Sequence, residues 1–288
     1  LFALTLEELL LSAGVDILYG TVVTDTVVED GFIKAVVVEN KSGRTAIAVE
    51  SVIDCTGDAD ICHYSGAPTV LNETGNGLAS WYYYYDGSEV RLKMFGLADV
   101  VPDRKDSADA NGNSPFTAEK TACLDQSFRF SGVDGYELSR AVLTAHRKMF
   151  DDILTQKETN PAFVPVTMST IPLVRMSRRI AGLYTMEESD DHVRLPDSVG
   201  MTGVWCKREP AYEIPFGALH CAEVRNLLAA GRAISTSLAM WNVTRVIPPC
   251  VVSGQAAGTA AALGNDFMQT DIARLQRVLE ADGVKLHL

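Results

Sequence analysis

The first third of the chain changes from helical to strand-like spacing of its apolar residues. Leucines between Thr5 and Gly14 recur at helical spacing, and Thr5 with Glu8 forms a capping-box pattern. This helix is expected to lead into a short strand. The turn signal Asp30-Gly31 and period-two alternation then predict a small antiparallel meander. The expected strands, beginning with the short one, are Val15–Thr21, Thr26–Glu29, Phe32–Glu39 and Thr45–Glu50.

A short apolar strand, Ser51–Cys55, runs directly into a glycine turn. Its Val52 and Ile53 suit a strand buried in a parallel sheet. The turn contains Thr56, Gly57 and Asp58, and a short helix follows as far as Ser65. A strand, a glycine turn and a helix in this order bring backbone N–H groups close to a ligand at the carboxyl end of a sheet.

The middle of the chain has a different character from about Leu71 onward, and we interpret residues 71–205 as an inserted second domain. Trp81–Tyr85 predicts an aromatic strand, Gly135–Lys157 a helix and Phe163–Leu173 a β-like segment, whereas Val100–Phe116 is polar and predicts a loop. The four tyrosines at 82–85 form either a stacking wall for an aromatic substrate or ordinary sheet packing, and packing is favoured.

The last third returns to alternating strand and helix. Asn226–Arg232 predicts a short buried strand, and Pro248 with Pro249 suggests a turn. Cys250–Leu263 predicts a helix of small residues, which indicates close packing against a sheet or a ligand because glycine otherwise weakens a helix. A final helix is expected over Asp271–Ala281.

Composition narrows the class of protein. The chain has 288 residues, 47% of them hydrophobic, which is enough for a sizeable core and favours two domains. A net charge of −12 argues against a nucleic-acid partner. No apolar stretch reaches the roughly 18–20 residues of a membrane span, and no signal-peptide pattern is present. Six scattered cysteines without zinc spacing indicate reduced thiols and a cytoplasmic location.

Three segments together resemble the FAD-dependent oxidoreductase family, whose FAD fold is shared with glutathione reductase and the fumarate-reductase flavoproteins. In chain order they are Val52-Ile53-Asp54-Cys55-Thr56-Gly57-Asp58 with the following helix, Arg175-Met176-Ser177-Arg178-Arg179-Ile180, and the run from Tyr212 through Gly231-Arg232 to Gly254-Gln255-Ala256-Ala257. Each segment alone is weak evidence for the resemblance. In this order and at this spacing, the three segments together cover most of the chain.

The resemblance implies an α/β fold with an incomplete FAD/NAD(P)-binding Rossmann-like domain. That domain would consist of a parallel sheet plus the β-meander, in two pieces at residues 1–70 and 206–288. The stretch 71–205 would be an inserted α+β substrate domain.

The resemblance also implies positions for the cofactor FAD. The strand edge at Val22 and Val23 would hold the adenine, and Thr56, Gly57 and Asp58 would lie near the adenosine and diphosphate. Gly231 and Arg232 would lie at the diphosphate and ribityl chain, where many relatives of the wider fold have Asp after the Gly. A helix N-terminus and a nearby cation would face the pyrimidine edge of the flavin, where the reduced form is negatively charged; the residues are Gly254, Gln255, Ala256, Ala257 and Arg245.

Two features depart from the family pattern. The family opens with a strand, G-x-G-x-x-G and a helix, and this sequence contains no such run. The family would place that unit before residue 1, so we expect the chain to be the C-terminal part of a family member, or to need a partner chain with the fingerprint. Met176 stands where the family usually has Glu, which leaves an acid/base role there without its residue.

The candidate catalytic residues are arginines and histidines outside the cofactor segments. Arg175, Arg178 and Arg179 either bind a substrate carboxylate bidentately or pair with carboxylates to tie the two domains together, and the sequence does not separate these readings. His192 and His220 are candidate proton donors, although a lone histidine is more often structural.

The leading hypothesis is therefore an FAD-dependent oxidoreductase, or the larger part of one. A hydride would pass between the flavin and a small organic substrate held between the domains, with an unknown electron partner. Two alternatives remain open. The chain is a cofactor-free fragment or non-catalytic subunit acting as a scaffold, or it has a fumarate-reductase-like activity on dicarboxylates.

Overall fold

The computed structural model describes residues 1–95, 128–171, 173–205 and 209–288. The predicted loop over 100–116 and the cysteines Cys123 and Cys206 lie outside these residues. The four cysteines that are described are all free.

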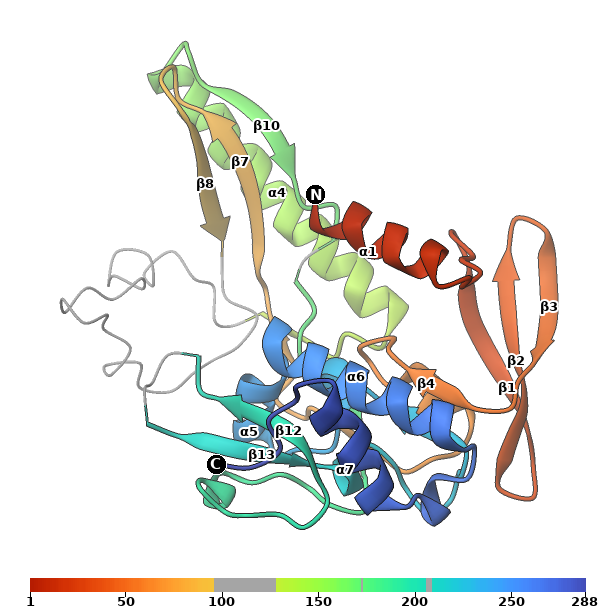
Figure 1. The fold of residues 1–288 in the computed structure, drawn as a ribbon. Helices are drawn as coiled ribbons and strands as arrows, with labels where there is room; N and C mark the ends of the chain where they lie inside the picture. The colour runs from red at the N-terminus through yellow and green to blue at the C-terminus, as the bar shows by residue number, and fades with distance from the viewer. Residues whose placement is uncertain (96–127, 172, 206–208) are drawn as a thin grey trace.

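The predicted meander is confirmed. Strands β1 (Val22–Glu29), β2 (Phe32–Asn40) and β3 (Gly43–Ala48) pair antiparallel in that order and extend to one side of the molecule (Figure 1). Asp30 and Gly31 have φ angles of 51° and 75°, as a two-residue hairpin turn with two left-handed residues requires. Only one face of β2 is buried, through Ile33 and Val38, and β3 is exposed along its whole length.

The opening helix differs from its prediction. Helix α1 (Phe2–Ser12) begins before Thr5, whose hydroxyl donates to the Leu1 carbonyl instead of capping a backbone N–H, so the capping box is wrong. None of the residues of α1 is buried. The strand expected over 15–21 is also wrong, because no described strand lies beside this segment to accept its backbone hydrogen bonds. The first strand begins only at Val22.

The centre of the fold is a parallel pair of strands from opposite ends of the chain. Strand β4 (Val52–Asp54) pairs in parallel with β14 (Leu227–Ala229), with Leu227 opposite Val52 and Ala229 opposite Asp54. Leu228 enters one hydrophobic core, and Leu227 and Ala229 enter another on the opposite side. Both faces are therefore covered, as the apolar run predicted for a parallel strand.

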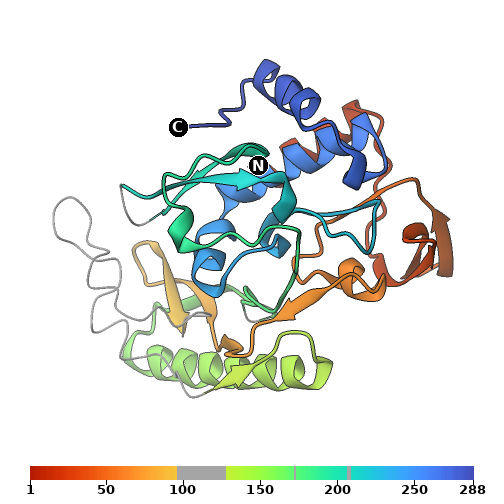
Figure 2. The same cartoon turned by 90° about the horizontal axis from the view of Figure 1, so that it is seen from below.

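One of these cores is formed by C-terminal helices against a strand pair. Helices α5 (Leu238–Thr244), α6 (Ile247–Leu263) and α7 (Ile272–Ala281) pack with the antiparallel strands β12 (Ser198–Gly203) and β13 (Ala211–Pro215), as Figure 2 shows. A Cβ on Gly200 would collide with Cγ1 of Val252, so strand and helix are as close as the small residues of α6 indicated.

Helix α6 begins earlier than predicted. Pro248 and Pro249 lie in its first turn and not in a separate turn before it. Proline is well suited to this position because the first N–H groups of a helix have no partner within the helix. The predicted final helix is confirmed, with Asp271 as its N-cap.

An outlying layer is formed by a long helix and a three-stranded sheet. Helix α4 (Gly135–Thr159) packs against β10–β7–β8, with bounds Val164–Met168, Ser80–Tyr85 and Val90–Phe95 (Figure 1). Tyr82 is fully buried and contacts Phe95 and Phe163, whereas Tyr83 and Tyr85 are exposed. The aromatic strand thus packs a core on one face, in agreement with the favoured prediction.

Short elements connect this layer to the centre. They are α2 (Asp60–Tyr64), β5 (Thr69–Leu71) paired with β11 (Arg178–Ile180), β6 (Asn76–Gly77) paired with β9 (Arg129–Phe130), and the 3-10 turns η2 (Glu188–Asp190), η3 (Phe216–Ala218), η4 (Gly231–Ala233) and η5 (Phe267–Gln269). The expected domain boundary at residue 205 falls between β12 and β13, which pair with each other. Val199 of β12 also belongs to the same core as Leu228.

A single buried amide connects the meander to the central strands. The Oδ1 atom of Asn226 accepts from Ile33 N at 2.8 Å, and its Nδ2 donates to the carbonyls of Ile33 and Glu50 at 2.8 and 2.9 Å. The side chain is 1% exposed. Asn226 therefore satisfies backbone groups that no neighbouring strand reaches.

Replacement of Asn226 by leucine should destabilise the fold strongly. The variant keeps the volume but leaves buried backbone groups of Ile33 and Glu50 without partners, at a cost of about 2–4 kcal/mol. Urea denaturation followed by circular dichroism measures the change. Asn265→Ala, at an exposed position, is the control and should change the free energy of unfolding by less than about 0.5 kcal/mol. Equal midpoints for the two variants would contradict this role of Asn226.

Candidate functional site

The ends of the two parallel strands bring two of the predicted motifs together. The Thr56-Gly57-Asp58 turn follows β4, and Gly231-Arg232 follows β14. The backbone N–H of Ala230 donates to the Asp54 carbonyl at 3.0 Å, which continues the ladder to the carboxyl edge. Ligands of open α/β sheets bind at this edge.

A buried carboxylate shapes the first turn. Asp54 is fully buried and accepts from Thr56 N at 2.9 Å, Thr56 Oγ1 at 2.7 Å and Cys62 N at 3.0 Å. Thr56 Oγ1 in turn accepts from Asp60 N at 3.0 Å, at the start of α2. The motif assigned Asp54 no role, but its carboxylate holds the turn and the helix in place.

Arg232 lies directly over Gly57. A Cβ on Gly57 would be 2.5 Å from the guanidinium carbon, and Gly57 has a φ of +86°. Nη2 of Arg232 is 3.1 Å from Asp58 Oδ1, whereas its Nε is buried and has no hydrogen-bond partner among the described residues. Bare backbone, a cation and an unsatisfied donor together form a place where an anionic group fits.

The charge balance of this pair is set by burial. Burial raises the pKa of the Asp58 carboxyl above its ordinary value, and the positive charge and hydrogen bond of Arg232 act in the opposite direction. Without Arg232 the Asp58 carboxylate would be a poorly solvated negative charge beside the proposed anion position.

Helix α6 reaches the same cluster through residues that the sequence analysis did not single out. Ser253 Oγ accepts from Gly231 N at 2.9 Å, and Cys250 Sγ lies 3.8 Å from where a Cβ of Gly231 would be. Burial raises the pKa of the Cys250 thiol. The early helix start at the proline pair is the sequence signal that would have placed these two residues in its first turns.

Gly254, Gln255, Ala256 and Ala257 lie in the middle of α6 and not at its N-terminus. The helix begins at Ile247, so the expectation that these four residues provide a helix N-terminus is wrong. Ala256 and Ala257 are fully buried in the core. Arg245 caps the end of α5, immediately before α6, and its Nη2 donates to Asn242 Oδ1 at 3.1 Å.

The three candidate arginines separate in space. Arg178 Nε donates to the Asp58 carbonyl at 2.9 Å, and its Nη2 pairs with Asp60 at 2.6 Å. Arg179, the next residue of β11, lies against the Trp241 ring at 5.6 Å. Arg175 precedes β11, and its backbone N donates to Asn76 Oδ1 at 3.0 Å. Of the two readings, carboxylate pairing describes Arg178.

The other predicted positions lie outside the Gly57–Arg232 cluster. His192 is exposed and pairs with Asp191 at 2.7 Å. His220 is buried against Phe216, and burial lowers the pKa of its imidazole. Val22 and Val23 begin β1, which passes beside α2; Val22 is exposed and Val23 packs on the core below it.

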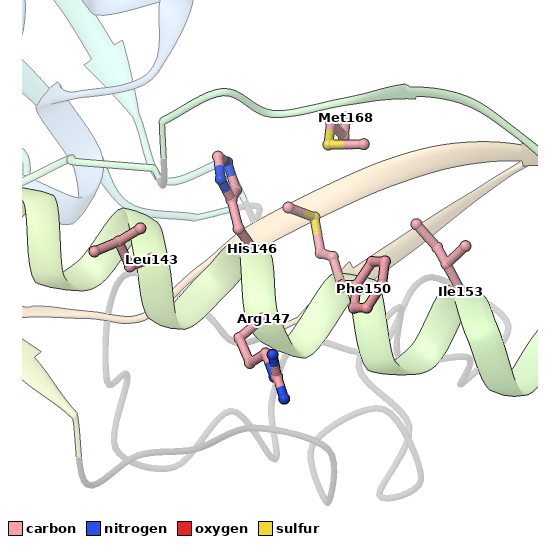
Figure 3. A pocket seen from close by; sticks show the side chains of 7 residues that line it. Leu143, His146, Arg147, Phe150, Ile153 and Met168 are labelled. Atoms are coloured by element: carbon pink, nitrogen blue, oxygen red, sulfur yellow. The ribbon is translucent and has the colours of Figure 1, made fainter.

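A cavity of about 380 Å³ lies elsewhere, between α4 and β10. In Figure 3, His146 rises from α4 toward the strand that carries Met168, and Arg147 points away from that strand. The lining is mostly apolar, includes the exposed Leu143, Phe150 and Met168, and shares no residue with the Gly57–Arg232 cluster.

Among the described residues, no group of three or more His, Cys, Asp or Glu side chains is arranged to hold a metal ion. No single described helix is long and apolar enough to cross a membrane; only the pair α5–α6, bent by 87°, meets the criteria of length and composition together.

Comparison with known structures gave distant similarities. BexE, from a study of oxidation during BE-7585A biosynthesis, is 16% identical with a TM-score of 0.37, and CabE, an aromatic hydroxylase from angucycline biosynthesis, is 14% identical with a TM-score of 0.39. Each alignment covers 96% of this chain and 48% of the other, so the chain spans about half the length of either protein. No curated protein matches the chain.

Comparison with protein families gave a match over nearly the whole chain. The model described as FAD dependent oxidoreductase matches residues 1–279. The Thr56-Gly57-Asp58 turn and the Gly231-Arg232 turn, which the fold brings together, both lie within the matched region. The protein is a member of the FAD dependent oxidoreductase family, and its cofactor is FAD.

Proposed function

We propose that FAD binds across the carboxyl ends of β4 and β14 and that the protein transfers a hydride between the flavin and a small organic substrate. The observation that carries this proposal is the cluster in which Gly57, Arg232 and Asp58 meet, with an unsatisfied Arg232 Nε. FAD supplies the redox chemistry when bound, and the protein supplies orientation and charge.

The residues of the cluster have distinct tasks in this proposal. Because Gly57 has no side chain, the Arg232 guanidinium can lie against the backbone of the first turn, where a diphosphate would meet the cation and the turn together. Arg232 offsets the negative charge of the diphosphate, and Asp54 and Ser253 fix the two turns.

We further propose that a separate unit with the G-x-G-x-x-G fingerprint completes the FAD site. Two observations support it. The 288 residues contain no such run. The described β4–β14 sheet has two strands, whereas a diphosphate-binding sheet of this type is built from repeated βαβ units. The unit would belong to the same polypeptide or to a partner chain.

Uptake of FAD is the direct test. With a fingerprint-bearing unit present, in the same polypeptide or supplied in trans, the protein incubated with FAD and desalted should be yellow, contain one FAD per chain, and lose its flavin absorbance on addition of dithionite. Without that unit the protein should retain much less FAD. A protein that stays colourless at saturating FAD even with the unit present would favour the alternative, a non-catalytic scaffold subunit.

Gly57→Ala should weaken FAD binding. The new Cβ displaces the Arg232 guanidinium, and we expect the dissociation constant for FAD to rise about tenfold or more, as measured by flavin fluorescence. Gly66→Ala is a matched control because Gly66 also has a positive φ, +76°, but has no atom within 4 Å of an added Cβ. Both variants should lose about 1 kcal/mol of stability from backbone strain. Equal FAD affinities would contradict the placement of the diphosphate at Gly57.

Arg232→Gln should make FAD binding depend on pH. Loss of the guanidinium raises the pKa of the Asp58 carboxyl further, and its charged form then repels the diphosphate. FAD should therefore bind the variant more tightly as the pH falls toward the raised pKa of the Asp58 carboxyl, which becomes neutral below it. The affinity of the wild type for FAD should change much less over the same pH range. In the double variant Asp58→Asn/Arg232→Gln the extra pH dependence should vanish, and its persistence would rule out Asp58 as the titrating group.

A further inference from the structure

Arg179 is a buried arginine that, unlike Arg232, has no carboxylate partner among the described residues. Arg179 is 9% exposed, and its Nε is buried with no hydrogen-bond partner among the described residues. No described carboxylate lies within ion-pair distance of it, although Arg178, the adjacent residue of β11, has one. Neighbouring residues of a strand point to opposite faces, so Arg178 turns to Asp60 and Arg179 turns to Trp241.

This arrangement costs free energy in the absence of a ligand. Burial lowers the pKa of the Arg179 guanidinium, and the negative charge of Glu187, which makes no ion pair with Arg179, opposes that shift. The contact with the Trp241 ring at 5.6 Å recovers part of the lost solvation. An unpaired buried charge is rarely kept in a fold unless something else uses it.

Arg179 lines a cavity of about 250 Å³ that is suited to a small organic anion. Its apolar lining residues are Val70, Leu71, Leu238 and Trp241, and its polar ones besides Arg179 are Asn72, Glu73 and Thr74. Arg179 is the only cation among the described lining residues. A guanidinium beside an indole and an aliphatic wall can bind a planar carboxylate and cover the hydrocarbon attached to it.

The cavity adjoins the proposed FAD site through one side chain. Trp241 Nε1 donates to the Arg232 carbonyl at 2.6 Å, while the Trp241 ring lines the cavity. Strand β11 also packs against the η4 turn that contains Arg232. Trp241 therefore contacts both the cavity and the backbone of Arg232.

We propose that the cavity binds an organic carboxylate through Arg179, and that this carboxylate belongs to the substrate. The anion site depends only on Arg179 and its surroundings, whereas the identification of its ligand as substrate rests on the proposed function. A monoanion is favoured over a phosphate group because the described lining residues include one cation, Arg179, and one acidic residue, Glu73, in a chain with net charge −12.

Ligand-observed NMR titration of the FAD-loaded protein tests the site with three probes. Benzoate should bind, and benzamide, of the same shape but neutral, should bind at least about tenfold more weakly because it lacks the charge-assisted pair. Inorganic phosphate should compete with benzoate only weakly. Equal binding of benzoate and benzamide would overturn the carboxylate site, and stronger binding of phosphate would overturn the choice of carboxylate.

Two variants locate the binding on Arg179. Arg179→Gln should weaken benzoate binding about tenfold or more without changing uptake of FAD, and Arg194→Gln, at an exposed arginine, is the control. Leu238→Glu serves if Arg179→Gln does not fold. Leu238 is 46% exposed at the start of α5, where an acidic residue is favourable, and its carboxylate would occupy Arg179 and exclude benzoate.

The two proposals fail separately. Benzoate binding that depends on Arg179 in a protein that takes up no FAD would support the anion site and overturn the proposed function. A folded, FAD-loaded Arg179→Gln variant that binds benzoate as the wild type does would overturn the anion site alone.

Discussion

The parallel pairing of β4 with β14 is the constraint on which the rest of the structure depends. The paired residues of the two strands are 175 positions apart in the chain, and their register sets Ala229 beside Asp54. Everything at the carboxyl edge follows from that register. Gly57 and Gly231 lie on adjacent turns, Arg232 can reach over Gly57 to Asp58, and α6 supplies Ser253 to the second turn. A slip of one residue in the pairing of β4 with β14 would turn the side chains of the slipped strand to the other face of the sheet.

Strand alternation has a similar effect on the arginines. In sequence, Arg178 and Arg179 belong to one basic cluster. In the fold, β11 directs Arg178 to Asp60 and to the carbonyl of Asp58 in the turn after β4, and directs Arg179 to Trp241 and a cavity. Trp241 connects the two environments through its hydrogen bond to the Arg232 carbonyl. The same two-residue motif thus serves structure on one face and offers a charge on the other.

Much of the local structure could be predicted because short-range signals determined it. The Asp30-Gly31 turn, the aromatic strand at Trp81–Tyr85 and the helix capped by Asp271 form as expected. The failures occurred where partners decide the outcome. Residues 15–20 have strand composition but no described strand beside them, and the capping pattern at Thr5 is bypassed by an earlier helix start. The division at residue 205 separates two strands that pair, because hydropathy does not reveal which strands meet.

The sequence by itself determined most of the elements, the family and the cofactor, because turn chemistry, apolar spacing and motif order are local or nearly local properties. The tertiary structure decided which motifs meet and which residues stay unpaired. Arg232 with Asp58, Ser253 with Gly231 and Asn226 with Ile33 are all contacts between distant segments. That no described carboxylate pairs with Arg179 is likewise visible only in three dimensions, because whether a buried charge is paired depends on what the fold packs around it.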